Sequence, residues 1–224
     1  GIFLLQSKET SVMKKALIFD IDGTLIDTID MYMPAMIDVL AQHGHPVAPD
    51  KVEQTKHDLF GITGQDALRL AGISEDEIPA IQQDWFKLAY QRADQVKVIE
   101  GIPEMLNTLA NREDARIAIA TSKLADEYQE YFVNKYDFAK LFKVTITSAD
   151  TKKHKPAPDP ILAAMDKMEA DPATTVYVGD TINDMKAAHA AGAKFAGALY
   201  SSANPDSIKD ADFPLMKPAD LLEI

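Results

Sequence analysis

Short apolar runs alternate with amphipathic segments along most of the chain. Each run has the length and composition of a strand buried on both faces of a parallel sheet. The segments between the runs carry apolar residues at spacings of three and four, which is the pattern of a helix packed on one side. Strands that alternate with helices predict a doubly wound α/β fold with a parallel sheet and right-handed crossovers. The apolar runs lie at 16–19, 116–120, 144–147, 175–178 and, more weakly, 194–198, and the helical segments lie at 102–111, 124–134, 160–169 and 181–191.

One stretch between the first two apolar runs does not continue this alternation. Apolar residues at helical spacing begin at Ile29 and end at Leu40, and the Gly44 and Pro46 that follow are typical of a helix end. The stretch therefore reads as helical rather than as strand and helix in turn. Further amphipathic segments lie at 51–60, 64–70 and 75–92.

These patterns divide the chain into two domains. We predict a helical domain at residues 29–96, inserted into a core domain that is formed by residues 13–28 and 97–224. Because Met13 begins a typical first strand, residues 1–12 are interpreted as an N-terminal extension or arm.

The composition is that of a globular protein with a hydrophobic core. The chain has 224 residues, 46% of them hydrophobic, which is enough for a medium α/β domain and a small inserted one. No apolar run approaches the ~20 residues that span a bilayer, and the apolar residues 2–5 are too few for a secretory signal. We therefore expect a cytoplasmic protein. The lack of cysteine excludes disulfides, thiolate metal sites and cysteine nucleophiles.

The net charge of -12 argues against two classes of partner. Nucleic acids and anionic membranes are bound mainly through lysine and arginine, so we expect neither as a partner. An anionic ligand would have to be held by local features such as a metal ion, a lysine or backbone N–H groups. The sequence does not indicate an oligomeric state.

Four short polar clusters follow apolar runs or lie in a loop. In the first cluster, Asp20 could attack phosphorus as a covalent nucleophile, and Asp22 could transfer protons. A distant acidic pair could hold a hard cation that prefers oxygen ligands, such as Mg²⁺. A hydroxyl and a lysine are then available to bind phosphate oxygens. The clusters are Asp20-Ile21-Asp22-Gly23-Thr24, Thr121-Ser122, Lys155-Pro156 and Gly179-Asp180-Thr181-Ile182-Asn183-Asp184.

Three of these clusters come directly after predicted strands. In doubly wound sheets the ligand lies beyond the carboxyl ends of the strands, so Asp20, Thr121 and Asp180 are expected at one edge although they are far apart in the chain. Asp184 lies one helical turn after Asp180 and can face the same site. Together the clusters predict a magnesium-assisted phosphoryl-transfer site.

The clusters resemble the four motifs of the haloacid dehalogenase (HAD) superfamily of phosphatases, in order and from about Lys14 onward. The resemblance implies that Asp20 forms an aspartyl-phosphate and that Asp22 serves as acid and then as base. It also implies that Lys155 neutralises charge on Asp20 and on the transferring group, and that the inserted helices form a C1-type cap. The residues that carry the resemblance are Asp20, Asp22, Gly23, Thr24, Thr121, Lys155, Asp180 and Asp184.

Ligands for the metal and for the phosphate follow from the same resemblance. It assigns magnesium to the Asp20 side chain, the Asp22 carbonyl oxygen and the Asp180 side chain. Asp184 is expected to act on the metal directly or through water. We expect the phosphate group of the substrate to be bound by Gly23, Thr24, Thr121, Ser122 and Lys155.

Several reactions remain open on this scaffold. The leading one is hydrolysis of a small phosphorylated metabolite, most like the phosphoglycolate-phosphatase branch, and the alternative is a sugar-phosphate mutase resembling β-phosphoglucomutase. The mutase branch often has Val in place of Thr24 and an acidic pair in place of Gly179-Asp180, which favours the phosphatase. Asp22 favours phosphate over halide, because halide needs no proton to leave. A phosphonate-cleaving enzyme would need a cap lysine such as Lys56, and the intact set of acids opposes a noncatalytic binding protein.

The inserted segment carries few specific signals. Lys56 and His57 precede a glycine-bounded turn that could face the substrate, although charged residues in such a segment are more often at the surface. Trp85 and Phe86 are interpreted as packing residues. No catalytic role for His154 follows from the sequence.

Overall fold

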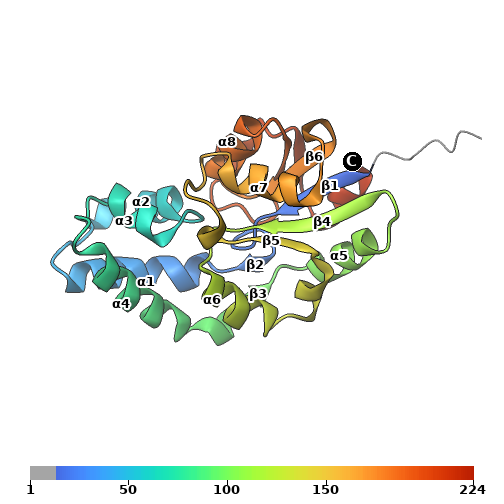
Figure 1. Ribbon diagram of the computed structural model, residues 1–224. Helices are drawn as coiled ribbons and strands as arrows, with labels where there is room; N and C mark the ends of the chain where they lie inside the picture. Colours follow the sequence, from blue (N-terminus) through green and yellow to red (C-terminus); the bar gives the residue numbers. More distant parts are fainter. Residues whose placement is uncertain (1–13) are drawn as a thin grey trace, which may run out of the picture.

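The computed structural model describes residues 14–224, so the expected arm at residues 1–12 lies outside the described residues. Within the described part of the chain, one parallel sheet of six strands has the order β5-β4-β1-β6-β7-β8 (Figure 1). The strands are β1 (Lys15–Phe19), β4 (Ala115–Ala120), β5 (Val144–Ile146), β6 (Thr175–Gly179), β7 (Lys194–Ala198) and β8 (Phe213–Leu215).

The hydrophobic pattern predicts the first five of these strands and misses the sixth. β8 is a three-residue strand at the edge of the sheet, with Pro214 at its centre. Proline is confined to edge strands and bulges because it cannot donate to a neighbouring strand. An isolated triplet with a proline therefore gives no strand signal in the sequence.

Helices cover both faces of the sheet, as a doubly wound fold requires. Alternate residues of β1 point to opposite faces: Leu17 and Phe19 pack into one hydrophobic cluster, and Ala16 and Ile18 into another. Figure 1 shows helices α5 and α6 on one side of the sheet and α7 and α8 on the other. These helices are α5 (Ile102–Ala110), α6 (Ala125–Tyr128), α7 (Asp159–Met168) and α8 (Ile182–Ala190).

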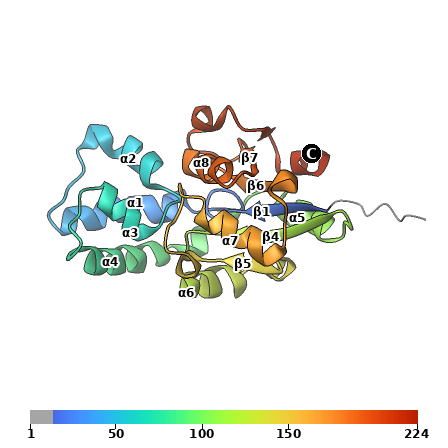
Figure 2. The same cartoon turned by 45° about the horizontal axis from the view of Figure 1, so that its top comes forward.

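Four further helices form the helical insertion, which has its own hydrophobic cluster. Both views place it at the end of the sheet toward which the strands run, opposite the C-terminus (Figures 1 and 2). The fold class is therefore confirmed: a doubly wound parallel sheet with inserted helices. The four helices are α1 (Ile29–Gln42), α2 (Val52–Leu59), α3 (Gly64–Leu70) and α4 (Ile78–Tyr90).

Two short strands join the helical insertion to the sheet domain. β2 (Ile26–Asp27) leads out of the sheet domain, and β3 (Lys97–Val98) leads back into it. They pair antiparallel, with Ile26 opposite Val98. The two connections therefore run side by side, and the insertion is joined to the rest of the protein by this narrow ribbon. Among residues 14–224, no helix combines the length and the apolar character needed to cross a bilayer.

Candidate active site

The four polar clusters meet at the carboxyl ends of the central strands, as the sequence predicts. Asp20 follows β1, Thr121 follows β4, and Asp180 follows β6. Lys155 comes from the loop between β5 and α7 and reaches the same place. The side chains of all four are almost completely buried.

Lys155 lies at the centre of a buried ionic network. Its Nζ lies 3.1 Å from Oδ1 of Asp20 and 2.9 Å from Oδ1 of Asp184, and it donates to the Tyr177 hydroxyl at 3.0 Å. Burial opposes the charge of Lys155, but the two carboxylates outweigh this effect and raise its pKa well above the ordinary value. The ammonium group therefore stays charged beside the carboxylate of Asp20.

Asp20 has one satisfied oxygen and one free oxygen. Oδ1 accepts from the backbone N–H of Ile21 at 2.8 Å and is the oxygen that faces Lys155. Oδ2 is buried and has no hydrogen-bond partner among the described residues. Burial and, next, the charge of Asp184 raise the pKa of Asp20. A buried carboxylate oxygen without a donor is costly, so Oδ2 is suited to a cation or an incoming electrophile.

Within residues 14–224, three carboxylates form a candidate metal site. Oxygens of Asp20, Asp180 and Asp184 all lie within 4.8 Å of one another. Asp180 accepts from the Thr24 hydroxyl at 3.0 Å through Oδ1, and burial followed by Asp184 and Asp20 raises its pKa. Magnesium prefers oxygen ligands and is commonly held by one or two carboxylates plus substrate oxygens. The three buried carboxylates are a donor set that fits that ion.

Asp184 also takes part in the N-terminal cap of α8. Its Oδ2 accepts from the backbone N–H groups of Asp180 and Thr181, both at 3.1 Å, and from the Thr181 hydroxyl at 3.0 Å. The Thr181 hydroxyl in turn accepts from the Asp184 N–H at 3.2 Å, so the two residues form a capping box. Thr181 is the N-cap of α8. Asp184 thus holds Asp180 and Lys155 in place at the same time.

Glycine is required at position 23 by its surroundings. Its φ is +79°, and a Cβ atom there would lie 2.1 Å from Oδ2 of Asp180 and 2.8 Å from the Phe60 ring. The loop after β7 supports this turn from behind. Ser201 donates to the Gly23 carbonyl at 2.5 Å, and Tyr200 donates to the Thr24 carbonyl at 2.8 Å.

Asp22 lies beside a buried lysine that belongs to none of the four sequence clusters. Its Oδ1 accepts from the Thr28 hydroxyl at 2.8 Å and lies 3.1 Å from Nζ of Lys123. Lys123 is only 3% exposed. The Thr121 hydroxyl accepts from the Lys123 N–H at 3.2 Å, which leaves its proton free for an anion, whereas Ser122 donates to the Gly61 carbonyl at 3.2 Å.

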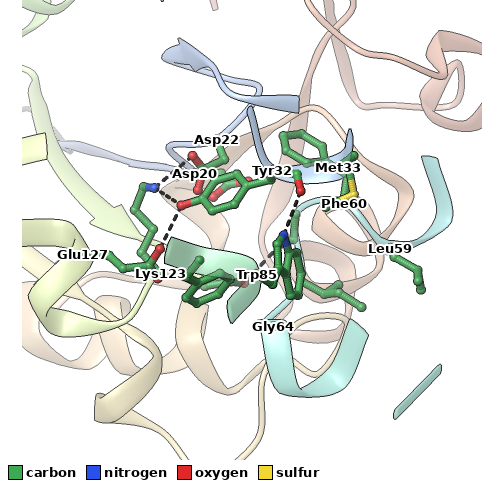
Figure 3. A pocket seen from close by; sticks show the side chains of 14 residues that line it. Asp20, Asp22, Tyr32, Met33, Leu59, Phe60, Gly64, Trp85, Lys123 and Glu127 are labelled. Atoms are coloured by element: carbon green, nitrogen blue, oxygen red, sulfur yellow. Dashed lines mark hydrogen bonds and ion pairs between the residues drawn. The ribbon is translucent and has the colours of Figure 1, made fainter. Parts of the chain in front are cut away.

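A pocket opens between these acids and the helical insertion (Figure 3). Its walls include Asp20, Asp22 and Lys123 from the sheet domain and Phe60 and Trp85 from the insertion. Trp85 is also part of the hydrophobic cluster of the insertion, and its Nε1 donates to the Tyr32 carbonyl at 2.7 Å. The pocket thus joins the polar clusters to an aromatic wall.

Two charged residues of the helical insertion do not line this pocket. Lys56 pairs with Glu53, which lies one turn earlier in α2, at 3.3 Å. His57 lines a different hollow, which also reaches Asp180 and Asn183.

His154 has a structural explanation that the sequence did not provide. One ring nitrogen lies 2.8 Å from the Ser148 carbonyl, and the other lies 3.9 Å from Asp66 of α3. It therefore lies where the insertion meets the sheet domain, and its hydrogen bond is to the loop after β5.

The comparisons with known proteins agree with this site. A model of the haloacid dehalogenase-like hydrolase family matches residues 17–198. The chain is 27% identical to a pyrophosphatase PpaX of Bacillus velezensis over 93% of this chain and 95% of that protein. It is also 27% identical to an N-acetylmuramic acid 6-phosphate phosphatase of Pseudomonas aeruginosa, over 94% of both chains.

A solved structure gives a stronger match. The crystal structure of a "putative phosphoglycolate phosphatase" from Lactobacillus plantarum is 32% identical, with a TM-score of 0.81, and the match covers 94% of this chain and 99% of that one. The chain therefore belongs to the haloacid dehalogenase-like hydrolase family. It is an enzyme of the phosphatase-like branch of that family, which confirms the resemblance drawn from the motifs.

Proposed function

We propose that this enzyme is a magnesium-dependent phosphatase that hydrolyses small phosphate monoesters through an aspartyl-phosphate, like the phosphoglycolate phosphatases. The observation that carries the proposal is the free, buried Oδ2 of Asp20, whose neighbouring oxygen Oδ1 is held by Lys155 and the Ile21 N–H. An attacking oxygen must be unpaired, fixed in direction and close to groups that stabilise the phosphoryl oxygens.

In the first half of the reaction, Oδ2 of Asp20 attacks phosphorus as the bond to the leaving oxygen breaks. Asp22 donates a proton to that leaving oxygen. Lys155 and the Thr121 hydroxyl bind phosphoryl oxygens, and Gly23 allows backbone N–H groups to approach them. Asp20 then carries the phosphoryl group as a mixed anhydride.

In the second half, Asp22 removes a proton from water, which attacks the phosphorus of the mixed anhydride. The bond between phosphorus and Oδ2 of Asp20 breaks, inorganic phosphate leaves, and Asp20 is restored. Magnesium, when bound, supplies positive charge that stabilises the phosphoryl oxygens. We assign it to the Asp20 and Asp180 side chains and the Asp22 carbonyl, with Asp184 acting through the cap of α8 and through water.

We propose that the helical insertion, residues 29–96, is a cap that closes the site. The Phe60 ring lies over Gly23, and the Gly61 carbonyl accepts from Ser122, so the start of the α2–α3 turn covers the phosphate-binding residues. Excluding water strengthens every charge interaction inside and prevents side reactions. The core domain would then comprise residues 13–28 and 97–224.

The proposed substrate is a small phosphorylated metabolite. The relatives include enzymes named for pyrophosphate, N-acetylmuramic acid 6-phosphate and phosphoglycolate, which share a phosphoryl group and little else. The sugar-phosphate mutase alternative is less well supported, because Thr24 donates to Asp180 in a contact that valine could not make.

One experiment tests the proposal and the alternative together. The purified protein is incubated with magnesium and a panel of phosphoglycolate, pyrophosphate, hexose phosphates and nucleoside monophosphates, and released phosphate and isomerised sugar are measured separately. We expect phosphate release that stops on addition of a chelator. Isomerisation without release would support the mutase, and turnover that ignores the chelator would contradict the metal dependence.

A further inference from the structure

A carboxylate of the sheet domain receives two tyrosine hydroxyls from the helical insertion. Glu127 of α6 is 6% exposed. Its Oε2 accepts from Tyr32 of α1 at 3.0 Å and from Tyr90, the last residue of α4, in a shorter contact. Figure 3 shows the Tyr32 side chain pointing between Glu127 and Lys123.

Helix capping alone does not explain this arrangement. The other oxygen of Glu127, Oε1, accepts from the Leu124 N–H at 2.9 Å, which is the contact of a capping box at the start of α6. Capping of α6 uses only one oxygen of Glu127, and an exposed glutamate could make the same contact. Burial of Oε2 against two hydroxyls is additional, and burying a carboxylate is unfavourable unless donors compensate.

The contacts continue from Glu127 to the proposed acid and base. The Tyr32 hydroxyl, which donates to Glu127, accepts from Nζ of Lys123 at 2.6 Å, and Lys123 is the cation beside Asp22. Burial and, next, Glu127 raise the pKa of Tyr32 well above the ordinary value, so the hydroxyl keeps its proton and can donate. Glu127, Tyr32, Lys123 and Asp22 thus form one continuous network.

The two tyrosines lie at the base of the helical insertion, where a small displacement of a side chain changes the position of the whole insertion. Tyr32 is in the first turn of α1, just after β2, and Tyr90 ends α4, shortly before β3. The Tyr90 ring also stacks on Tyr131 of the sheet domain, with centroids 3.8 Å apart and planes 4° apart. These positions are beside the ribbon that joins the two domains, so they set the angle at which the whole insertion covers the pocket.

We propose that Glu127 is a positioning residue, which fixes the helical insertion over the pocket through Tyr32 and Tyr90 and thereby places Lys123 beside Asp22. The part of this inference that concerns turnover rests on the proposed function. The part that concerns the position of the insertion does not, and it can be measured without any substrate.

Trp85 provides that measurement, because it is the one tryptophan of the chain. It is 3% exposed, and it is bonded to the carbonyl of Tyr32. In Glu127→Ala and Tyr90→Phe we expect acrylamide quenching of its fluorescence to rise about twofold, as the insertion populates open positions. Glu130→Gln and Tyr131→Phe are the matched controls, since Glu130 is an exposed acid of the same segment and Tyr131→Phe keeps the stacked ring.

Steady-state kinetics on the best substrate of the panel then tests the effect on the reaction. We expect KM to rise about tenfold in Glu127→Ala and Tyr90→Phe, because loss of a hydrogen bond to a charged group shifts an equilibrium by about that factor. We expect the two controls to keep the KM of the wild type.

The other possible results also test the proposed role of Glu127. If Glu127→Ala does not fold, Tyr90→Phe and Tyr32→Phe, which remove one hydroxyl each, carry the test. Quenching and KM equal to those of the controls would overturn the proposal and leave Glu127 as a helix cap. If the wild type hydrolyses no phosphate at all, the proposed function fails, whereas the quenching data still decide the role of Glu127.

Discussion

At the scale of single residues, the site concentrates negative charge that the protein alone does not balance. Asp20, Asp22, Asp180 and Asp184 are each at most 8% exposed, and the cations in contact with them are Lys155 and Lys123 within the described residues. After burial, the charge of Asp184 contributes most to the raised pKa of Asp20 and of Asp180, and a cation relieves this repulsion. We therefore expect a bound cation to stabilise the site, and its effect can be measured apart from the proposed role of Asp20 as nucleophile.

Replacement of Asp20, the proposed nucleophile, should abolish turnover and preserve the fold. Asp20→Asn is nearly isosteric, but an amide cannot form the aspartyl-phosphate, so we expect kcat to fall by about a thousandfold or more. Phosphate release measures the activity, and circular dichroism with thermal melting confirms folding. A folded Asp20→Asn that keeps most of its activity would remove Asp20 from the assignment.

Magnesium should stabilise the protein as well as activate it. A ligand that binds only the native state stabilises it by about 2.7 kcal/mol at a hundredfold excess over its Kd. We expect magnesium to raise the melting temperature of the wild type and a chelator to reverse the rise. Asp180→Asn should show neither response, and an unchanged shift in that variant would mean that the ion binds elsewhere.

At the scale of elements, the site depends on how loops and helix ends are held. The turn at Gly23 fits under Asp180 and Phe60, and the cap of α8 depends on the contact between Thr181 and Asp184. These are local structures whose residues are also the proposed chemical groups. A change that alters the turn alone should therefore also disturb the chemistry.

Two glycines with a similar positive φ allow that test. Gly23→Ala combines a positive φ with a Cβ that would lie 2.1 Å from Asp180, so we expect loss of activity and about 3 kcal/mol of stability. Gly44→Ala has a φ of +83° and no atom within 4 Å of the new Cβ. It should cost only about 1 kcal/mol of strain and keep full activity. Equal effects of the two changes on activity would contradict the steric explanation.

The contacts of Asp212 with α8 and β7 should stabilise the fold at neutral pH, and this stabilisation should be lost in acid. Asp212 accepts from the Phe195 N–H at 2.8 Å and lies 2.7 Å from Nε2 of His189. Burial opposes its charge, but these donors outweigh burial and lower its pKa. A lowered folded pKa gives stability that is present above the unfolded value, about 4, and is lost as the pH falls through the folded value.

Thermal melting between pH 7 and pH 3 measures this effect. We expect the wild type to lose its advantage over Asp212→Asn as the pH falls below about 4. A difference between the two proteins that is constant across this range would show that the charge of Asp212 contributes nothing.

At the scale of the whole molecule, most of the architecture could be predicted from the sequence, because apolar periodicity and motif order are properties of the chain itself. Five strands, the flanking helices and the inserted helices follow from it. β8 could not, since Pro214 interrupts a strand of only three residues. The ribbon of β2 and β3 could not either, because two-residue strands have no periodicity.

The convergence of the site could also be predicted, but its supporting contacts could not. The carboxyl-end rule brings Asp20, Thr121 and Asp180 together without knowledge of their neighbours. Lys123 and Glu127 acquire their roles only from tyrosines of the insertion, which are far away in the chain. In the sequence, a tyrosine on an apolar helix face is interpreted as a packing residue. The partner of its hydroxyl can be identified only from the three-dimensional structure.

The net charge of -12 should make kcat/KM depend on the salt concentration. The overall field repels an anionic substrate, and salt screens that field over a Debye length of about 10 Å at 0.1 M. We therefore expect kcat/KM for a phosphorylated metabolite to rise between about 10 and 100 mM salt. A steep fall would mean that local cations dominate the approach of the substrate.

The central place of β1 has a consequence for how the protein is made. β1 pairs with β4 on one side and with β6 on the other, so this strand has neither of these partners until residues 115–120 and 175–179 have been synthesised. Ser202, which donates to the Asp180 carbonyl at 2.7 Å, emerges later still. Nascent chains that stop before Ser202 contain the proposed nucleophile but not the finished site, so the proposed catalysis requires synthesis to pass this residue.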